Sequence, residues 1–190
     1  MADDRTATNK VKGHTFKSWF EAYEKVCGAP AKSALILALD KDFSDAVRFG
    51  ALVASGWYPI HWYTSLYEVH ARLAGRTPGF ARKMGRITTE QDLRGVYSFI
   101  VKLASPATVL TNAQRLLKLY VQQCETFFME RGPTHVRFTM TIPGSTDEMW
   151  EEFTGGSEAI LSANGARDPV VSFARIDDKS VFIDGAWKER

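Results

Sequence analysis

The segment from Gly155 to Trp187 constrains the fold more than any other part of this chain. It begins with the small-residue run Gly-Gly-Ser-Glu-Ala-Ile-Leu-Ser-Ala-Asn-Gly-Ala-Arg and continues into two alternating stretches, Pro169 to Ile176 and Ser180 to Trp187. A small-residue helix that ends at Gly165 and leads into two strands with alternating residue character predicts a helix packed on a β-hairpin.

A second hairpin is expected upstream of this helix. Cys124 to Met129 and His135 to Thr141 are rich in β-branched and aromatic residues, and they flank the turn residues Gly132-Pro133. Ser145 or Asp147 can then cap the helix, and the pair Gly155-Gly156 is expected to break or kink it. The last third of the chain therefore predicts a four-stranded antiparallel sheet covered by a helix.

The first two-thirds of the chain predict helices. Apolar residues from Phe16 to Cys27 recur at three- and four-residue steps, and Gly28 and Pro30 follow as terminators. Similar patterns predict helices over Ala31–Leu39, from Asp42 or Ser44 to Leu52, Pro59–Leu73, Phe80–Ile87, Asp92–Leu103 and Pro106–Tyr120. The fold class is therefore α+β, with a helical N-terminal two-thirds followed by the sheet.

The length and composition fit one domain. The chain has 190 residues, of which 45% are hydrophobic, enough for one sizeable core. Residues 1–10 lack apolar periodicity and are expected to form a flexible tail. Residues 11–190 are expected to form a single domain, with a helical subdomain over 11–122 and an α/β subdomain over 123–190.

The charge balance argues against nucleic acid as a partner, and the hydropathy pattern argues against a membrane. Lysine and arginine number 24 against 22 aspartates and glutamates, which is too balanced for a nucleic-acid-binding protein. No run approaches the roughly 20 apolar residues of a membrane span, so no membrane insertion is expected. The polar N-terminus has no export signature, and Cys27 and Cys124 are expected to be reduced, buried thiols. These features predict a soluble cytoplasmic protein.

Several segments together resemble one superfamily of sensor domains. They are Val-Lys-Gly-His-Thr-Phe at 11–16, Gly-Trp-Tyr-Pro-Ile-His-Trp-Tyr at 56–63, Ala-Arg-Lys-Met-Gly-Arg at 81–86 and the final helix and hairpin. In layout and hydrophobic register the chain resembles the heme-nitric-oxide-binding superfamily and its heme-free relatives, the 4-vinyl reductase-like small-molecule-binding domains. It is most similar to a myxobacterial branch. The resemblance implies a bacterial, ligand-binding signalling domain.

The heme site that the resemblance implies lacks its key residues here. The resemblance would place the iron-ligating histidine on the helix over 106–120 and a Tyr-x-Ser-x-Arg motif near His135 to Ile142. The helix contains no histidine, and the strand reads Arg-Phe-Thr-Met-Thr-Ile, so neither feature carries over. The cysteine-rich metal signature of the vinyl reductase-like relatives is also missing. We therefore expect no heme, metal or other cofactor.

An aromatic cluster around residue 60 gives the candidate ligand pocket. Apolar walls with a few polar tips are typical of ligand sites, and ordinary core packing is the alternative interpretation. The candidate pocket residues are Trp57, Tyr58, Trp62, Tyr63, Tyr67 and His70.

Two other clusters have structural interpretations beside functional ones. His61 and His70 are nine residues apart on one predicted helix, so they point to opposite sides and should not share a metal. The basic residues from Arg72 to Arg86, among them Arg82, form either a solvated face or a site for an anion or an acidic partner.

Three functions remain open from the sequence. The first is a non-catalytic, sensor-like regulatory domain that binds a small apolar ligand or a protein partner without heme. The second is a ligand-free interaction subunit that binds a protein partner or a second copy of itself and uses the sheet face or Trp150 and Phe153 as its interface. The third is an enzyme with Tyr67 and His70 as its acid and base.

Overall fold

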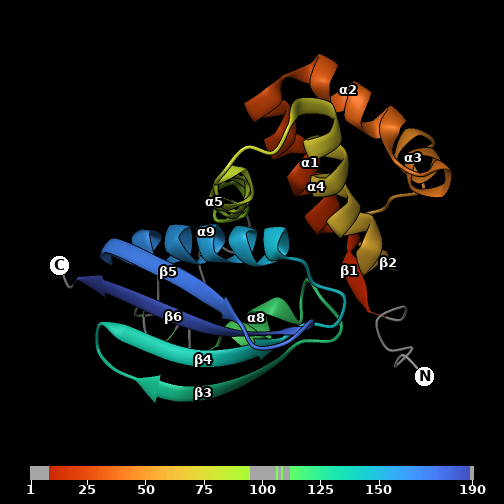
Figure 1. Cartoon of the computed structure of the whole chain (residues 1–190). Helices are drawn as coiled ribbons and strands as arrows, with labels where there is room; N and C mark the ends of the chain where they lie inside the picture. Colours follow the sequence, from red (N-terminus) through yellow and green to blue (C-terminus); the bar gives the residue numbers. More distant parts are fainter. Residues whose placement is uncertain (1–8, 95–105, 107, 109–111, 189–190) are drawn as a thin grey trace.

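The computed structural model describes residues 9–94, 106, 108 and 112–188 (Figure 1). The described helices are α1 (Gly13–Cys27), α2 (Ala29–Ala38), α3 (Lys41–Arg48), α4 (Ile60–Ala74), α5 (Phe80–Asp92), α8 (Ala113–Leu117) and α9 (Asp147–Ala163). The strands are β1 (Lys10–Lys12), β2 (Trp57–Pro59), β3 (Glu125–Arg131), β4 (His135–Thr141), β5 (Arg167–Arg175) and β6 (Ser180–Lys188). A helical first part followed by a sheet confirms the α+β class predicted from the sequence.

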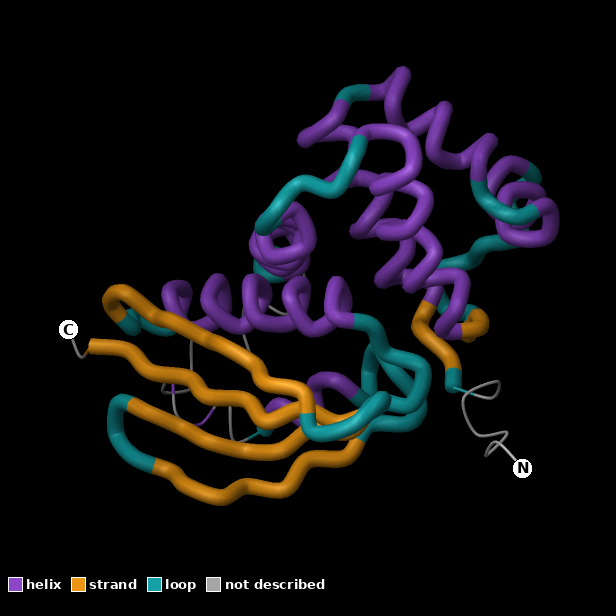
Figure 2. The backbone as a smooth tube through the Cα atoms, in the orientation of Figure 1, coloured by secondary structure: helices purple, strands orange, loops and turns teal. Residues whose placement is uncertain are grey.

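The C-terminal sheet has the strand order β3-β4-β6-β5, and all its neighbours are antiparallel. Alternate residues of the central strand β4, namely Val136, Phe138 and Met140, are buried, as a sheet with one covered face requires. In Figures 1 and 2, α9 lies along the sheet beside β5, and α5 lies on the other side of α9. The sequence prediction of two hairpins and a covering helix is confirmed.

The helical half is built around the aromatic face of α1. Phe16, Trp19, Phe20 and Tyr23 are buried at three- and four-residue steps, as their spacing predicts. The helix ends at Gly28, which has a φ of +88° and donates its backbone N–H to the Glu24 carbonyl at 2.8 Å.

Several predicted boundaries differ from the structure. Pro30 lies in the first turn of α2 and does not terminate α1, because its missing N–H is tolerated there. Asp40 caps α3, in place of Asp42 or Ser44, by accepting the Phe43 N–H at 2.9 Å. This helix ends at Arg48, well before Leu52.

The short sheet formed by β1 and β2 was not predicted from the sequence. Val11 pairs with Tyr58, and Lys12 pairs with Trp57. Pro59 keeps the residue before it extended and then precedes α4, so the segment is a strand up to the helix start.

The glycine pair in α9 does not break the helix. Helix α9 runs from Asp147 to Ala163, through Gly155 and Gly156, and is capped by Thr146. A Cβ at Gly155 would overlap the backbone of Arg82 in α5, so the glycines allow the two helices to approach closely. The chain leaves the helix at Gly165, where φ is +92°.

Some predictions fall outside the described residues. The predicted tail over 1–10 is described only from residue 9, and the predicted helix over 92–103 only up to residue 94. Of the predicted helix over 106–120, the described part includes α8. The division at residue 122 stays a prediction. In the described part of the chain, no helix is both long enough and apolar enough to span a bilayer.

Candidate functional site

A cavity of about 220 Å³ lies between the helical half and the α/β half. Helices α1, α4, α5, α8 and α9 and the loop before α9 all contribute residues to its walls. The described lining residues are Thr15, Tyr63, Gly85, Thr88, Thr89, Asp92, Leu93, Leu116, Leu117, Tyr120, Val121, Ile142, Ser145, Met149, Trp150, Glu152, Phe153, Gly156, Ser157 and Ile160. Most of these side chains are apolar or aromatic, which is typical of ligand sites.

The crossing of α5 and α9 shapes one wall. A Cβ at Gly85 would overlap the carbonyl oxygen of Glu152, and a Cβ at Gly156 would lie 2.7 Å from Thr89 Oγ1. Gly85 and Gly156 both line the cavity, so the close approach of the two helices defines this wall.

Glu152 places a carboxylate on this wall. Its Oε1 accepts the hydroxyl of Tyr63 at 2.6 Å. The buried hydroxyl of Tyr67 has no hydrogen bond of standard geometry, yet it lies close enough to favour the ionised carboxylate as well. Burial outweighs both contacts and raises the pKa of Glu152 to about 7, so the group titrates near neutral pH.

Asp92 supplies a second carboxylate at the end of α5. Its Oδ1 accepts the Ser18 hydroxyl at 2.9 Å and lies 3.2 Å from His14 Nε2. Burial raises the pKa of Asp92, and the hydrogen bond from Ser18 and the adjacent His14 oppose that rise.

Three lining residues carry buried polar atoms without a hydrogen-bond partner. These atoms are Thr15 Oγ1, Ser145 Oγ and Trp150 Nε1. Buried polar groups in proteins are nearly always paired, so these three atoms are exceptions among the residues that line the cavity.

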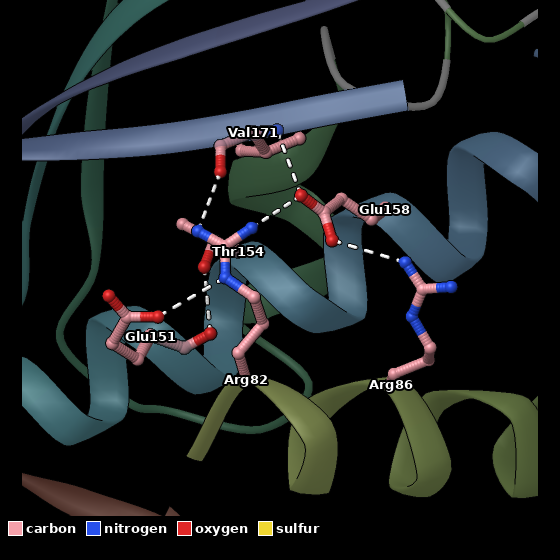
Figure 3. A network of polar contacts seen from close by, with 6 residues as sticks. All are labelled: Arg82, Arg86, Glu151, Thr154, Glu158 and Val171. Carbon is pink, nitrogen blue, oxygen red and sulfur yellow. Dashed lines mark hydrogen bonds and ion pairs between the residues drawn. The ribbon is translucent and has the colours of Figure 1, made fainter. Parts of the chain in front are cut away.

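A polar network anchors α5 to α9 and to the sheet (Figure 3). The buried carboxylate of Glu158 accepts from Arg82 Nη1 at 2.5 Å, from Arg86 Nη2 at 3.2 Å and from the Val171 N–H at 3.1 Å. Arg82 also donates to the Val171 carbonyl at 3.0 Å and to Glu151 at 3.2 Å. Arg82 and Arg86 of the basic cluster are therefore held by internal carboxylates.

Of the aromatic residues predicted as a pocket, Tyr63 lines the cavity. Trp57 is half-buried under the Lys12 ammonium, which lies 4.5 Å from its ring centre. Tyr58 donates to the Ala51 carbonyl at 2.7 Å, and Trp62 stacks on Phe43 at 4.8 Å.

Tyr67 and His70 lie in the core of the helical half. His70 stacks on Phe80 at 3.8 Å, and its Nδ1 lies 3.1 Å from the Tyr23 hydroxyl. Burial lowers the pKa of His70, so the imidazole is neutral at pH 7. Tyr67 packs edge-on against Trp19 at 5.6 Å.

Of the two residues assigned to an interface from the sequence, Trp150 is buried and Phe153 is half-buried. Trp150 is 1% exposed, and Trp150 and Phe153 both line the cavity. Helix α9 packs against β5 of the sheet and against α5, which leaves little of its aromatic surface exposed. The aromatic pattern alone could not separate a helix covered on two sides from one covered on a single side.

Sequence reasoning missed Glu152 and Asp92. Glu152 lies within a stripe formed by Met149, Phe153, Gly156 and Ile160, which share one face of α9 at three- and four-residue steps. An acidic residue in an apolar stripe is the signal that could have found it.

The histidine and cysteine side chains, which commonly bind metals and heme iron, lie outside the described cavity walls. All four histidines lie in the described part of the chain, at positions 14, 61, 70 and 135, and none lines the cavity. The described residues contain no group of three or more His, Cys, Asp or Glu side chains arranged to hold a metal. Cys27 is half-buried and Cys124 is buried, and neither lines the cavity.

The fold is that of solved H-NOX (heme-nitric-oxide-binding) domains. Neither a protein-family model nor a curated protein matches the sequence. A mutant H-NOX protein from K. algicida aligns with a TM-score of 0.76 and 12% identity, covering 94% of this chain and 97% of that chain. A Tt H-NOX variant aligns with a TM-score of 0.70 and 11% identity, covering 94% and 95%. An oxygen-binding H-NOX domain related to soluble guanylate cyclases aligns with a TM-score of 0.67 and 12% identity, covering 94% and 95%.

Proposed function

We propose that this chain is a non-catalytic, sensor-like regulatory domain that binds a small, mainly apolar ligand in the cavity between its two halves, without heme. The observation that carries the proposal is the cavity itself, which has apolar walls, buried unpaired polar atoms and contributions from both halves of the fold. The resemblance to H-NOX domains, one of which binds oxygen, supports the sensor class. A myxobacterial source and a cytoplasmic location are part of the same proposal.

The position of the cavity suits a regulatory role. A ligand that touches α1, α4 and α5 and also α9 contacts both halves of the molecule. Such a ligand shifts the arrangement of the halves if it binds one arrangement more tightly, typically by about 1–3 kcal/mol. The altered surface would then change the binding of a protein partner.

The chemistry of the walls supports the absence of heme. Heme iron is held by His, Cys, Met or Tyr, and the described walls offer Met149, Tyr63 and Tyr120 but no histidine or cysteine. They also offer Glu152 and Asp92 but no lysine or arginine, whereas the propionates of a heme are bound best by cations. The volume of about 220 Å³ is below the ~300–1,000 Å³ of sites for drug-sized ligands, so it suits a molecule much smaller than heme.

The contacts of Tyr67 and His70 support a non-catalytic role. The His70 Nδ1 lies 3.1 Å from the Tyr23 hydroxyl, whereas Tyr67 lies near Glu152. Neither residue lines the cavity. An acid and a base that act on one substrate should reach the same space.

Filling the cavity tests the proposal. Propylbenzene is an apolar probe of suitable size, and its binding should raise the Tm of the wild-type protein. Ile160→Trp places a larger ring on the cavity wall and should abolish that rise. Ile176→Trp, the same change at an exposed position, should leave it intact. Equal shifts in the two variants would refute a ligand site in the cavity.

A second candidate function rests on a separate observation. Strand β3 is an edge of the sheet, and its Phe127 and Met129 side chains are 72% and 60% exposed. Exposed apolar side chains on an edge strand favour pairing with another chain. An interaction subunit without a ligand would use this strand.

Light scattering separates the two candidates. An interaction subunit should show a mass that rises with protein concentration, and Phe127→Ser should return it to the monomer value of 21.3 kDa. A sensor that is monomeric alone should stay at that mass over the whole concentration range.

A further inference from the structure

We propose that the cavity ligand is a small protonated amine with an apolar body, and that the Glu152 carboxylate binds its ammonium group. This inference rests on the proposed function and specifies the chemical class of the ligand.

The acidic side chains in the cavity walls favour a cationic ligand. The described walls contain Glu152 and Asp92 but no lysine, arginine or histidine. Asp92 has His14 beside it, whereas among the described residues no cationic side chain forms an ion pair with Glu152. Arg82, one helix away, is already bound to Glu151 and Glu158. Glu152 is half-buried, and a half-buried carboxylate without a cation is destabilised as an ion, so an ammonium ligand supplies the missing charge.

The unpaired hydroxyls are the second argument. An ammonium group has three N–H donors and no acceptor, so it needs several acceptor atoms. Thr15 Oγ1 and Ser145 Oγ are buried, unpaired and belong to the cavity walls. Hydroxyl oxygens and the carboxylate oxygens of Glu152 are acceptors of the required kind. Trp150 Nε1 is also unpaired, but it only donates and takes no part in this recognition.

The aromatic walls are the third argument. Tyr63, Tyr120, Trp150 and Phe153 all line the cavity. Aromatic faces attract cations through their quadrupole, and they also bury the apolar body of an amine. An acidic group among aromatic rings therefore suits an ammonium better than a neutral hydrocarbon.

The volume limits the size of the amine. An engineered protein cavity of about 150 Å³ binds benzene, so about 220 Å³ accommodates a molecule a few heavy atoms larger. A phenyl ring with a two-carbon amine meets this limit, and 2-phenylethylamine is a suitable probe.

Three probes of equal heavy-atom count separate charge from shape. We would titrate the full chain with 2-phenylethylamine, 2-phenylethanol and propylbenzene at pH 8 by calorimetry. The proposal predicts that the amine binds at least tenfold more tightly than the other two. If the neutral probes bind equally well or better, the amine proposal is overturned and the ligand site stands. If no probe binds, the ligand site and the amine proposal both fail.

A pair of matched variants tests whether the Glu152 carboxylate binds the ammonium group of the ligand. Glu152→Gln keeps an acceptor for Tyr63 and removes the charge, so the amine should lose at least tenfold in affinity while 2-phenylethanol changes less than threefold. Glu148→Gln is the control, because Glu148 lies on the same helix outside the cavity walls, near Arg76. It should leave both affinities unchanged. An amine affinity that survives Glu152→Gln would overturn the proposal.

Discussion

At the scale of single residues, the pKa of Glu152 is set by two opposing effects, its burial and its hydrogen bonding. Burial raises the pKa of this carboxyl to about 7 from an ordinary 4.5, although the Tyr63 and Tyr67 hydroxyls favour its ionised form. The folded state therefore binds a proton more tightly than the unfolded state does. The corresponding stability is fully present below pH 4.5 and is lost as the pH rises through about 7.

This carboxyl predicts a pH dependence of the free energy of unfolding. Between pH 5 and pH 8 the wild-type protein should lose up to about 3 kcal/mol through this group. In Glu152→Gln this contribution is absent, so its free energy of unfolding should fall less over the same range, by about the amount that the wild type loses through Glu152. Glu148→Gln should show the same pH dependence as the wild type. Urea unfolding at the two pH values measures the difference. A wild-type slope retained by Glu152→Gln would show that another group is responsible.

At the scale of elements, the contact between α5 and α9 depends on glycines at the crossing. A Cβ at Gly85 or Gly155 would overlap backbone atoms of the facing helix, whereas at Gly156 it would meet the side chain of Thr89. A side chain can rotate away, but a backbone cannot move without separating the helices.

A graded series of alanine substitutions tests this contact. Gly85→Ala and Gly155→Ala should each destabilise the protein by about 2–4 kcal/mol, because overpacking outweighs the helix propensity gained. Gly156→Ala should cost less than either. Chemical unfolding gives the order, and a cost for Gly156→Ala as large as the other two would contradict the account.

The Glu158 network joins the same helices to β5. Arg82→Met should cost about 3 kcal/mol, because it leaves a buried carboxylate with one arginine. Arg86→Met should cost under about 1 kcal/mol, since Arg86 is nearly half-exposed and makes a single contact with Glu158.

A double-mutant cycle isolates this interaction. Combining Arg82→Met with Glu158→Gln should cost less than the sum of the two single changes, because the uncompensated charge is gone. Additive costs would mean that Arg82 and Glu158 are not coupled.

Local patterns account for what the sequence could predict at this scale. The face of α1 and both hairpins follow from periodicity and turn residues, which depend on neighbours in the chain. The pairing of β1 with β2 depends on residues almost fifty positions apart. The role of Gly155 depends on what lies opposite it, so sequence reasoning read a helix break where the structure has a helix crossing.

At the scale of the whole molecule, the fold was predictable and the cavity was not. The order of helices and strands follows from local patterns along the chain. The cavity, in contrast, joins residues from five helices and the loops between them. Tyr63 and Glu152, which meet at 2.6 Å, are 89 positions apart. The aromatic cluster around residue 60 was a reasonable pocket candidate, but most of it packs within the helical half.

The most direct test of the central claim is native mass spectrometry of the freshly purified protein, with an absorbance scan of the same sample. We predict a bound molecule of low mass on the 21.3 kDa chain, lost on denaturation, and no Soret band. The Ile160→Trp variant should carry none of it, and Ile176→Trp should carry the wild-type amount. A Soret band, or a wild-type chain that is bare in its native state, would contradict the account.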